Sequence, residues 1–185
     1  QLILINDRST DETGAIIDRL AAENEKIAAI HIDVLPDGWL GKVHALHVAT
    51  EQAAGEWLLY TDADVHFEPN ALVELMQFAQ AHEIDHLAGL PRMKPSGVLL
   101  EIAIAAFYTS SMFFVSAKRV ANVDDPLAVG VGALNLVRAS VLKQTEGFEW
   151  LKMETIDDVG LGLMMKRGGG RAMVARAGEQ ISLEW

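Results

Sequence analysis

The sequence predicts an α/β fold with a largely parallel sheet and helices on both of its faces. Short apolar runs alternate along the chain with longer segments whose apolar residues recur every three to four positions. This order is typical of parallel sheets, in which each helix returns the chain to the start of the next strand. The chain has 185 residues, 50% of them apolar, and no shift of composition divides it, so we expect a single domain over residues 1–185.

The first half of the chain supplies three predicted strands and three predicted helices. The strands are apolar runs: Leu2–Ile5, Ile27–Val34 and the run that begins at Trp57. A first helix is indicated by Ser9-Thr-Asp-Glu12, which resembles a capping box, and by the apolar residues Ile16, Ile17, Leu20 and Ile27. Two further segments have helical spacing: Val43–Ala53, and a helix from about Pro69 to His82 that proline opens.

The second half contains one long apolar segment among shorter elements. The shorter elements are the strands Leu87–Leu90 and Ala133–Val137 and a helix over Val159–Lys166 that Gly168-Gly-Gly170 ends. The long segment, Val98–Val115, is broken mainly by Glu101. Its length is at the lower edge for a membrane span, and an acidic residue is costly in lipid. We therefore predict a buried helix, with an interfacial helix that meets a lipid-borne substrate as the alternative.

Composition excludes several classes of function. The formal charge of −11 and the pI near 4.9 argue against a nucleic-acid partner and against electrostatic docking on anionic lipid. The absence of cysteine excludes disulfides and thiolate metal sites and fits a reducing compartment. The chain starts without an initiator Met or signal peptide, in what reads as a strand, so we expect a fragment of a longer protein.

The first candidate site is a pair of carboxylates, Asp62 and Asp64, which directly follow the Trp57 strand. Open α/β sheets bind their ligands at the carboxyl ends of the strands. Residues i and i+2 of an extended chain point the same way, so the two carboxylates can converge on one hard divalent cation. An Asp-rich turn that closes the strand is the alternative.

Two further candidate sites precede this pair. Asn6-Asp-Arg-Ser-Thr-Asp11 follows the first strand, where a carboxylate accepts hydrogen bonds from a base or ribose, or where Ser9 or Asp11 caps the next helix. In Gly38-Trp-Leu-Gly-Lys42 the glycines let the backbone approach a ligand and Lys42 reaches a phosphate oxygen. An ordinary glycine loop is the alternative, and the spacing is not that of a Walker P-loop.

A fourth candidate, Glu154-Thr-Ile-Asp-Asp158, stands just before a predicted helix. A carboxylate held near other acids has a raised pKa and suits a general base, whereas helix capping is the alternative. Consecutive helical residues point about 100° apart, so we expect only one of Asp157 and Asp158 to face a given site.

Taken in order, these motifs resemble those of family 2 glycosyltransferases, which have the GT-A fold. The matching segments are Asn6–Asp11, Gly38–Lys42, Thr61–Asp64, Gly130-Val-Gly-Ala-Leu-Asn-Leu-Val-Arg138 and Ile156-Asp-Asp158. The combination of Gly38-Trp-Leu-Gly-Lys42 with Thr61-Asp-Ala-Asp64 is similar to a membrane-associated branch that includes hopanoid-associated and ceramide glucosyltransferase-like enzymes. The resemblance implies a mixed, mostly parallel, Rossmann-like sheet.

The resemblance also implies an activity and roles for individual residues. A sugar would move with inversion from a nucleotide-diphosphate donor, expected to be a UDP-sugar, to a hydroxyl of a sugar or lipid acceptor. Asp7 would contact the nucleotide, Asp62 the ribose or metal shell, and Asp64 a Mg²⁺ or Mn²⁺ ion at the diphosphate. Asp158 would take the acceptor's proton, with Asp157 as the second choice. Such an enzyme would work on the cytoplasmic side of a membrane.

The chain also departs from the family pattern. The family's preceding strand, with a donor-binding Pro and acidic residue, is not present, so we expect an incomplete nucleotide site. The Q/R-x-x-R-W motif of processive and ceramide-type members is not recognisable.

Two other functions fit part of the pattern. In a haloacid dehalogenase-like phosphohydrolase, Asp62 would be the phosphorylated nucleophile, Asp64 the general acid, and Asp157 and Asp158 the magnesium ligands. That family places its nucleophile on the first strand of its core, whereas two strand-helix units precede Asp62 here. A non-catalytic nucleotide-binding fragment is the third reading.

Overall fold

The structure, a computed structural model, describes residues 1–184, apart from the side chains of residues 107 and 111–114. The strands are β1 (Leu2–Asp7), β2 (Ile27–Ile32), β3 (Trp57–Tyr60), β4 (Val65–Phe67), β5 (His86–Leu90), β6 (Arg92–Lys94), β7 (Asn135–Arg138), β8 (Ala172–Arg176) and β9 (Ile181–Glu184). The longer helices are α1 (Thr13–Glu23), α2 (Gly41–Gln52), α3 (Ala71–Ala81), α4 (Val98–Phe114) and α8 (Asp157–Arg167). The short helices are α5 (Ala117–Ala121), α6 (Ala139–Leu142) and α7 (Phe148–Leu151).

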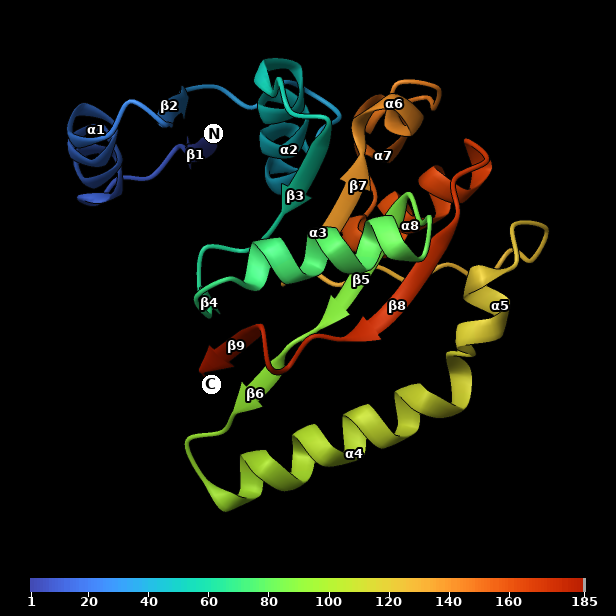
Figure 1. The fold of residues 1–185 in the computed structure, drawn as a ribbon. Coiled ribbons are helices and arrows are strands. Elements are labelled where there is room, and N and C mark those ends of the chain that lie inside the picture. Colours follow the sequence, from blue (N-terminus) through green and yellow to red (C-terminus); the bar gives the residue numbers. More distant parts are fainter. Residues whose placement is uncertain (185) are drawn as a thin grey trace.

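The strands form three sheets that follow one another across the molecule (Figure 1). β1 and β2 pair in parallel. The central sheet has the order β3-β7-β5-β8, in which β7 is antiparallel to both β3 and β5, and β5 is parallel to β8. A small third sheet has the order β4-β9-β6. The carboxyl end of β3 and the amino end of β7 therefore lie at the same edge of the central sheet.

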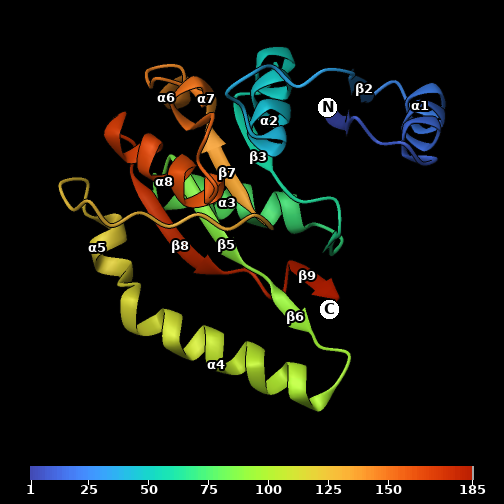
Figure 2. The ribbon, with the colours of Figure 1, turned by 180° about the vertical axis from the view of Figure 1, so that it is seen from behind.

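Helices cover both faces of the central sheet, with α3 on one face and α8 on the other (Figures 1 and 2). Successive residues of a strand point to opposite faces, and β7 shows the consequence. Leu136 packs with Leu75 and Ala79 of α3, whereas the next residue, Val137, packs with Val43 of α2 and with residues of α8. The two cores hold β7 and α8 in fixed relative positions.

The predicted α/β class and the helices on both faces are confirmed, and the sheet is mixed. The parallel pairings do not predominate, because three of the six pairings between described strands are antiparallel. Two of these three involve β7, which enters the middle of the sheet from a loop and not from a crossover helix. A run as short as Ala133–Val137 carries no signal for strand direction.

The elements predicted from sequence exist, with their ends shifted by a few residues. The most important shift is at α8, which begins at Asp157 and not at Val159, so that the acidic pair forms its first turn. The predicted strand Ala133–Val137 is observed as Asn135–Arg138, which leaves Gly130–Leu134 as loop. Strands β4, β6, β8 and β9 went unpredicted, since three to five residues show no clear period.

Two predictions of local structure are wrong. Ser9 does not cap α1, whose N-cap residue is Glu12 and makes no side-chain cap hydrogen bond, whereas Asp11, the other residue considered for capping, accepts the N–H of Thr13 at 3.0 Å. The segment predicted as a buried helix, α4, is exposed along its outer face, where Leu99 is 85% exposed. Within the described residues no helix has both the length and the apolar content needed to cross a bilayer.

Candidate active site

Three charged side chains from separate elements meet at the carboxyl edge of the central sheet. Lys42 lies in the first turn of α2, Asp62 follows β3, and Asp157 opens α8. The ammonium of Lys42 lies 2.9 Å from Oδ1 of Asp62 and 3.7 Å from Oδ2 of Asp157. The ammonium of Lys42 therefore links two carboxylates, Asp62 and Asp157, that lie far apart in the chain.

The same residues line a large cavity. Its volume is about 1050 Å³, and its lining residues include Lys42, Asp62, Asp157 and Asp158. Both residues of the acidic pair are among the lining residues, and the ion pair with Lys42 places the carboxylate of Asp157 within the cluster.

Two glycines allow the backbone to approach these acids closely. A Cβ on Gly132 would lie 2.5 Å from Oδ2 of Asp62, and a Cβ on Gly130 would lie 1.7 Å from the carbonyl oxygen of Asp158. Atoms that are not bonded to each other do not come this close, so any larger residue would displace Asp62 or the start of α8. The segment Gly130–Gly132 therefore lies in a space between Asp62 and the start of α8 that is too narrow for residues with a side chain at positions 130 and 132.

Hydrogen bonds fix the residues around this spacer. The N–H of Asp62 donates to the carbonyl of Gly132 at 3.1 Å, and the hydroxyl of Thr61 donates to the carbonyl of Ala133 at 2.9 Å. The side chain of the buried Asn135 accepts the N–H of Val131 at 3.4 Å and a hydrogen bond from the buried His86 at 3.0 Å. The end of β3 is thereby tied to the loop that precedes β7.

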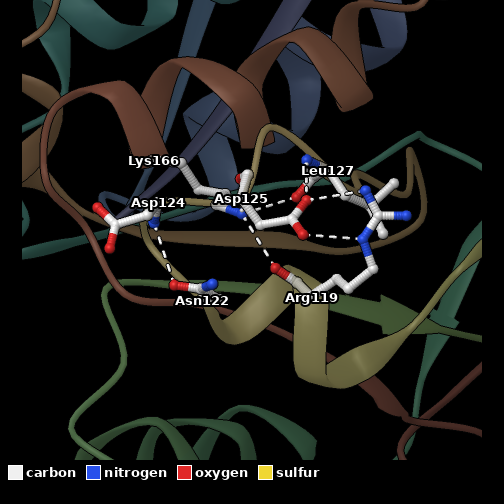
Figure 3. A network of polar contacts seen from close by, with 6 residues as sticks. All are labelled: Arg119, Asn122, Asp124, Asp125, Leu127 and Lys166. Atoms are coloured by element: carbon white, nitrogen blue, oxygen red, sulfur yellow. Dashed lines mark hydrogen bonds and ion pairs between the residues drawn. The ribbon is translucent and has the colours of Figure 1, made fainter.

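A buried lysine holds the earlier part of the same loop (Figure 3). Lys166 of α8 is 4% exposed, and its ammonium donates to the carbonyls of Asp125 at 2.6 Å, Leu127 at 2.7 Å and Arg119 at 3.3 Å. An ammonium has three donors, so all of them are used. The carboxylate of Asp125 in turn accepts two hydrogen bonds from the Arg119 guanidinium and the N–H of Leu127. Lys166 therefore positions the chain that leads to Gly130.

Asp7 lies on the other side of the amino end of α2. Its carboxylate accepts two hydrogen bonds from the guanidinium of Arg8, which holds the pKa of Asp7 below its usual value. A Cβ on Gly41 would lie 2.5 Å from Oδ2 of Asp7, so this glycine lets α2 begin beside the carboxylate. Asp7 and the Lys42 cluster thus flank one helix terminus, where backbone N–H groups favour anions.

The cluster perturbs its own ionisation. Burial raises the pKa of Asp157, against the attraction of Lys42 and with the repulsion of Asp158 and Asp62. Burial acts to lower the pKa of Lys42, but the hydrogen bond that Lys42 donates to Asp62 and the charges of Asp157, Asp62 and Asp158 outweigh it, so the pKa is raised. Lys42 is thus held as a cation beside a carboxyl group that takes up a proton more readily than an exposed aspartate does.

Asp64 lies outside this cluster. Residues 63–64 form a turn that leads into β4, so Asp62 and Asp64 do not share the face of one extended strand, and that expectation is wrong. Asp64 is exposed and does not line the large cavity. In the part of the chain that the structure describes, no group of three or more His, Asp or Glu side chains is placed to hold a metal ion by itself.

Sequence reasoning found the charged residues and missed the groups that position them. The glycines at positions 130 and 132 belonged to a predicted motif, but only the structure shows which atoms they avoid. Lys166 follows Met164 and Met165, both of them fully buried, and a lysine placed directly after apolar residues of a helix was the available signal.

Comparison with known proteins agrees with this geometry. The sequence model described as glycosyl transferase family 2 matches residues 1–145. The glycosyltransferase AglD of Haloferax volcanii is 37% identical over 89 residues, which is 48% of this chain and 14% of AglD. The match with the family model decides against the haloacid dehalogenase-like alternative.

Solved structures share the fold. The mannosyltransferase PcManGT from Pyrobaculum calidifontis, in complex with GDP-Man and Mn²⁺, superposes with a TM-score of 0.70 at 18% identity, over 100% of this chain and 47% of that one. S. aureus TarS gives 0.66 at 21% identity, over 100% of this chain and 31% of TarS. TarS residues 1–349 in complex with UDP give 0.62 at 18% identity, over 100% and 51%.

The chain thus spans about half or less of the length of these relatives. Because identities near 20% show the fold alone, these neighbours establish the GT-A fold, and the match over residues 1–145 establishes the family. The chain belongs to glycosyltransferase family 2.

Proposed function

We propose that the protein to which this chain belongs transfers a sugar, with inversion, from a nucleoside-diphosphate donor to an acceptor oxygen. The observation that carries the proposal is the convergence of Lys42, Asp62, Asp157 and Asp158 on one cavity in a family 2 domain. Inversion needs one displacement, so a single base and a stabilised leaving group suffice, and no side chain has to form a covalent intermediate.

The donor site would lie around the amino end of α2. Asp7 would accept a hydrogen bond from the base or ribose, and Lys42 would lie against the diphosphate. We expect a uridine nucleotide. TarS has been solved with UDP and with UDP-GlcNAc, and PcManGT with GDP-Man, so the fold accommodates different bases.

A divalent metal fits this site only as a partner of the substrate. Mg²⁺ is commonly held by one or two carboxylates together with substrate phosphates, so Asp62, which is partly exposed at the cavity, would suffice on the side of the protein. Mg²⁺ or Mn²⁺ bound there would neutralise charge on the departing diphosphate. Lys42 would neutralise part of the charge of the diphosphate even without a metal, because its ammonium lies at the same place, 2.9 Å from Oδ1 of Asp62.

We assign the general base to Asp158, with Asp157 as the second choice. Asp157 is ion-paired to Lys42, whereas among the described residues Asp158 has no ion-pair partner. Oδ1 of Asp158 accepts the N–H of Val159 at 2.8 Å, which fixes the carboxylate at the cavity wall. The base would accept the proton of the acceptor hydroxyl as its oxygen attacks the anomeric carbon.

We also propose that residues 1–185 are one catalytic domain that lacks its first donor-binding strand. Among the described strands, β1 pairs only with β2, and β3 pairs only with β7. Within this set of strands, neither β1 nor β3 has a partner on its other edge. One further strand between β1 and β3 would join the two sheets. Unpaired edges of this kind ordinarily bind another strand.

A thermal-shift titration tests the donor site of this chain. UDP with Mn²⁺ should raise the unfolding midpoint, because a ligand at a hundredfold excess over its Kd adds about 2.7 kcal/mol of stability. EDTA should remove most of the shift, and Asp62→Asn should reduce it. GDP and a series of UDP-sugars define the base and the sugar. If no nucleoside diphosphate shifts the midpoint, the chain is a family 2 domain without a working donor site.

Two further measurements separate the remaining readings. Transfer from a radiolabelled UDP-sugar by the longer protein distinguishes an enzyme from a non-catalytic nucleotide-binding domain. The second measurement is hydrolysis of p-nitrophenyl phosphate. If the wild-type chain hydrolyses it and Asp62→Asn does not, the result would contradict the assignment as a transferase.

A further inference from the structure

A fully buried histidine lies beside the loop that separates the acids of the site. His86 is the first residue of β5, which lies between β7 and β8 (Figure 2), and it is 0% exposed. Burial of a polar ring costs free energy unless hydrogen bonds compensate for it, so the partners of this ring indicate what it holds in place.

The hydrogen bond of the His86 ring fixes where its hydrogen lies. Nε2 of His86 lies 3.0 Å from Oδ1 of Asn135, and this oxygen also accepts the backbone N–H of Val131 at 3.4 Å. Because the backbone N–H can only donate, the side-chain oxygen of Asn135 is the atom that faces both groups, and Nε2 is assigned as the second donor. Among the described residues, the buried Nδ1 has no hydrogen-bond partner. Burial lowers the pKa of His86, against the effect of the hydrogen bond to Asn135, so the ring is neutral and carries its hydrogen on Nε2.

Val131 stands between the two glycines that lie next to the acids. Gly130 lies against the carbonyl oxygen of Asp158, and the carbonyl of Gly132 accepts the N–H of Asp62 at 3.1 Å. The N–H of Val131 belongs to the planar peptide group that joins Gly130 to Val131, so the hydrogen bond that it donates fixes the orientation of that group. Rotation of this peptide group would move the backbone that lies against both acids.

The helix that carries the proposed base packs against the same histidine. A Cβ on Gly162 of α8 would clash with the carbonyl oxygen of Val129 and would lie 3.0 Å from Cε1 of His86. The glycine therefore lets α8 lie against the loop and the ring at the same point, where a larger residue does not fit. His86 is thus packed against α8 directly and joined through Asn135 to the loop beside Asp158.

We propose that His86 is a positioning residue of this active site: through Asn135 it fixes the peptide group before Val131, and that group sets the places of the acids on either side. The acids are Asp62 at the donor site and Asp158, the proposed base. The inference rests on the proposed transfer reaction, because it concerns the acids of that same site. Loss of a hydrogen-bond partner that orients a binding group commonly costs about 10- to 100-fold in affinity or activity, which sets the size of the expected effect.

Two substitutions of His86 form a matched pair. In His86→Gln the side-chain amide can reach the position of Nε2 and donate to Asn135, whereas His86→Leu occupies a similar volume without a donor. UDP with Mn²⁺ should bind about tenfold more weakly to His86→Leu, and within about threefold of the wild-type affinity to His86→Gln. Isothermal titration measures these affinities.

A third variant controls for lost stability. Leu142 is buried in α6, which follows β7 at the end of that strand opposite the acids. Leu142→Ala should lower the urea midpoint, because it opens a cavity in the core, while its affinity for UDP with Mn²⁺ stays within about twofold of wild type.

Amide hydrogen exchange tests the positioning without a nucleotide. The amides of Val131 and Asp62 should exchange faster in His86→Leu than in the wild type, and at the wild-type rate in His86→Gln. Amides of β8 in the same variant report unfolding of the whole domain and serve as the reference. Unchanged exchange at Asp62 in His86→Leu would overturn the proposal, as would equal affinities of His86→Leu and the wild type for UDP with Mn²⁺.

The wild-type ring provides a measurement that needs no variant to fold. Nitrogen NMR at neutral pH should show the hydrogen of His86 on Nε2 and none on Nδ1. A hydrogen on Nδ1, or losses of affinity that are equal in His86→Gln and His86→Leu, would also contradict the positioning role.

These outcomes stay separate from the test of the proposed function. The NMR and exchange measurements need no nucleotide, whereas the shift of the wild-type midpoint with UDP and Mn²⁺ needs no substitution of His86. If UDP does not shift that midpoint while exchange at Asp62 responds to His86→Leu as expected, the donor site is contradicted and the positioning of the acid stands. If UDP shifts the midpoint and binds His86→Leu as it binds the wild type, the role of His86 is contradicted and the transferase stands.

Discussion

Two lysines hold the loop and acids of this site by different means. Lys166 is 4% exposed, and all three of its donors are used by backbone carbonyls of α5 and of the loop that follows it. The side chain of Lys42 is 49% exposed, is paired with Asp62 and Asp157, and lines a cavity. Lys166 has no donor left for a ligand. Lys42 is paired with two carboxylates at the cavity, and an anionic ligand would compete with them for its ammonium.

The difference shows how a structural charge is told from a functional one. A buried ammonium that donates only to backbone carbonyls fixes the course of the chain, and its removal leaves those carbonyls without a donor. An ammonium that lies between carboxylates at a cavity is in a position to bind an anionic ligand. Substitution of Lys166 should therefore change stability, and substitution of Lys42 should change binding.

The largest effect on stability is expected for Lys166→Met. Methionine keeps the length and apolar stem of lysine, but three partly buried hydrogen bonds to backbone carbonyls are lost, so the free energy of unfolding should fall by about 3 kcal/mol. Urea denaturation measures this difference. Arg119→Gln, which removes the exposed partner of Asp125 in the same network, should cost less. If Lys166→Met is as stable as the wild type, the network of Figure 3 does not hold the loop.

Lys42→Met should show the opposite pattern. The shift of the unfolding midpoint with UDP should be largely lost, because the cation opposite the diphosphate is gone. Stability without ligand should fall by only about 1 kcal/mol or less, since the ion pair with Asp62 is half exposed. Isothermal titration with UDP provides the affinity. An unchanged affinity for UDP would place the diphosphate away from Lys42.

Gly132→Ala should act on the acid beside it. The new Cβ would lie 2.5 Å from Oδ2 of Asp62, so this carboxylate has to rotate, and affinity for UDP with Mn²⁺ should fall about tenfold, as when a group that orients a metal ligand is lost. Gly97→Ala is the control, since a Cβ there meets nothing within 4 Å. Equal affinities of the two variants would mean that Asp62 is free to move.

The smallest expected effect is on pH dependence. Burial raises the pKa of Asp157 above its usual 3.8, so the folded chain binds a proton that the unfolded chain releases. The stability from this group is present below pH 3.8 and is lost as the pH rises through the raised pKa. Urea midpoints from pH 3.5 to 7 should therefore fall less in Asp157→Asn than in the wild type. Parallel curves would show that Asp157 has no raised pKa.

The sequence was sufficient to predict the acids of the site and the longer helices and strands in their order. Asp62 follows a strong apolar strand and Asp157 stands at a helix start, and both signals are local. The sequence did not predict the direction of β7, which depends on the irregular loop before it. It also did not predict the position of Asp64, because the turn at residues 63–64 ends the extended chain before that residue. Gly132 and Lys166 act through partners 70 and about 40 positions away, and no local pattern carries that information.

The exposed face of α4 illustrates the same limit. The sequence of this apolar segment favoured a buried helix, and it left an interfacial helix as the alternative. Only the position of α4 at the end of the sheet, with Leu100 inward and Leu99 outward, separates them.

Sugar transfer by the longer protein with Asp158→Asn tests the central claim most directly. Asparagine keeps the shape of the side chain but does not accept a proton, so the rate of transfer should fall by about 10²- to 10⁴-fold while UDP still binds. Asp157→Asn, measured in parallel, should lose much less. Full activity in Asp158→Asn, or its loss only in Asp157→Asn, would contradict the assignment of the base at the head of α8.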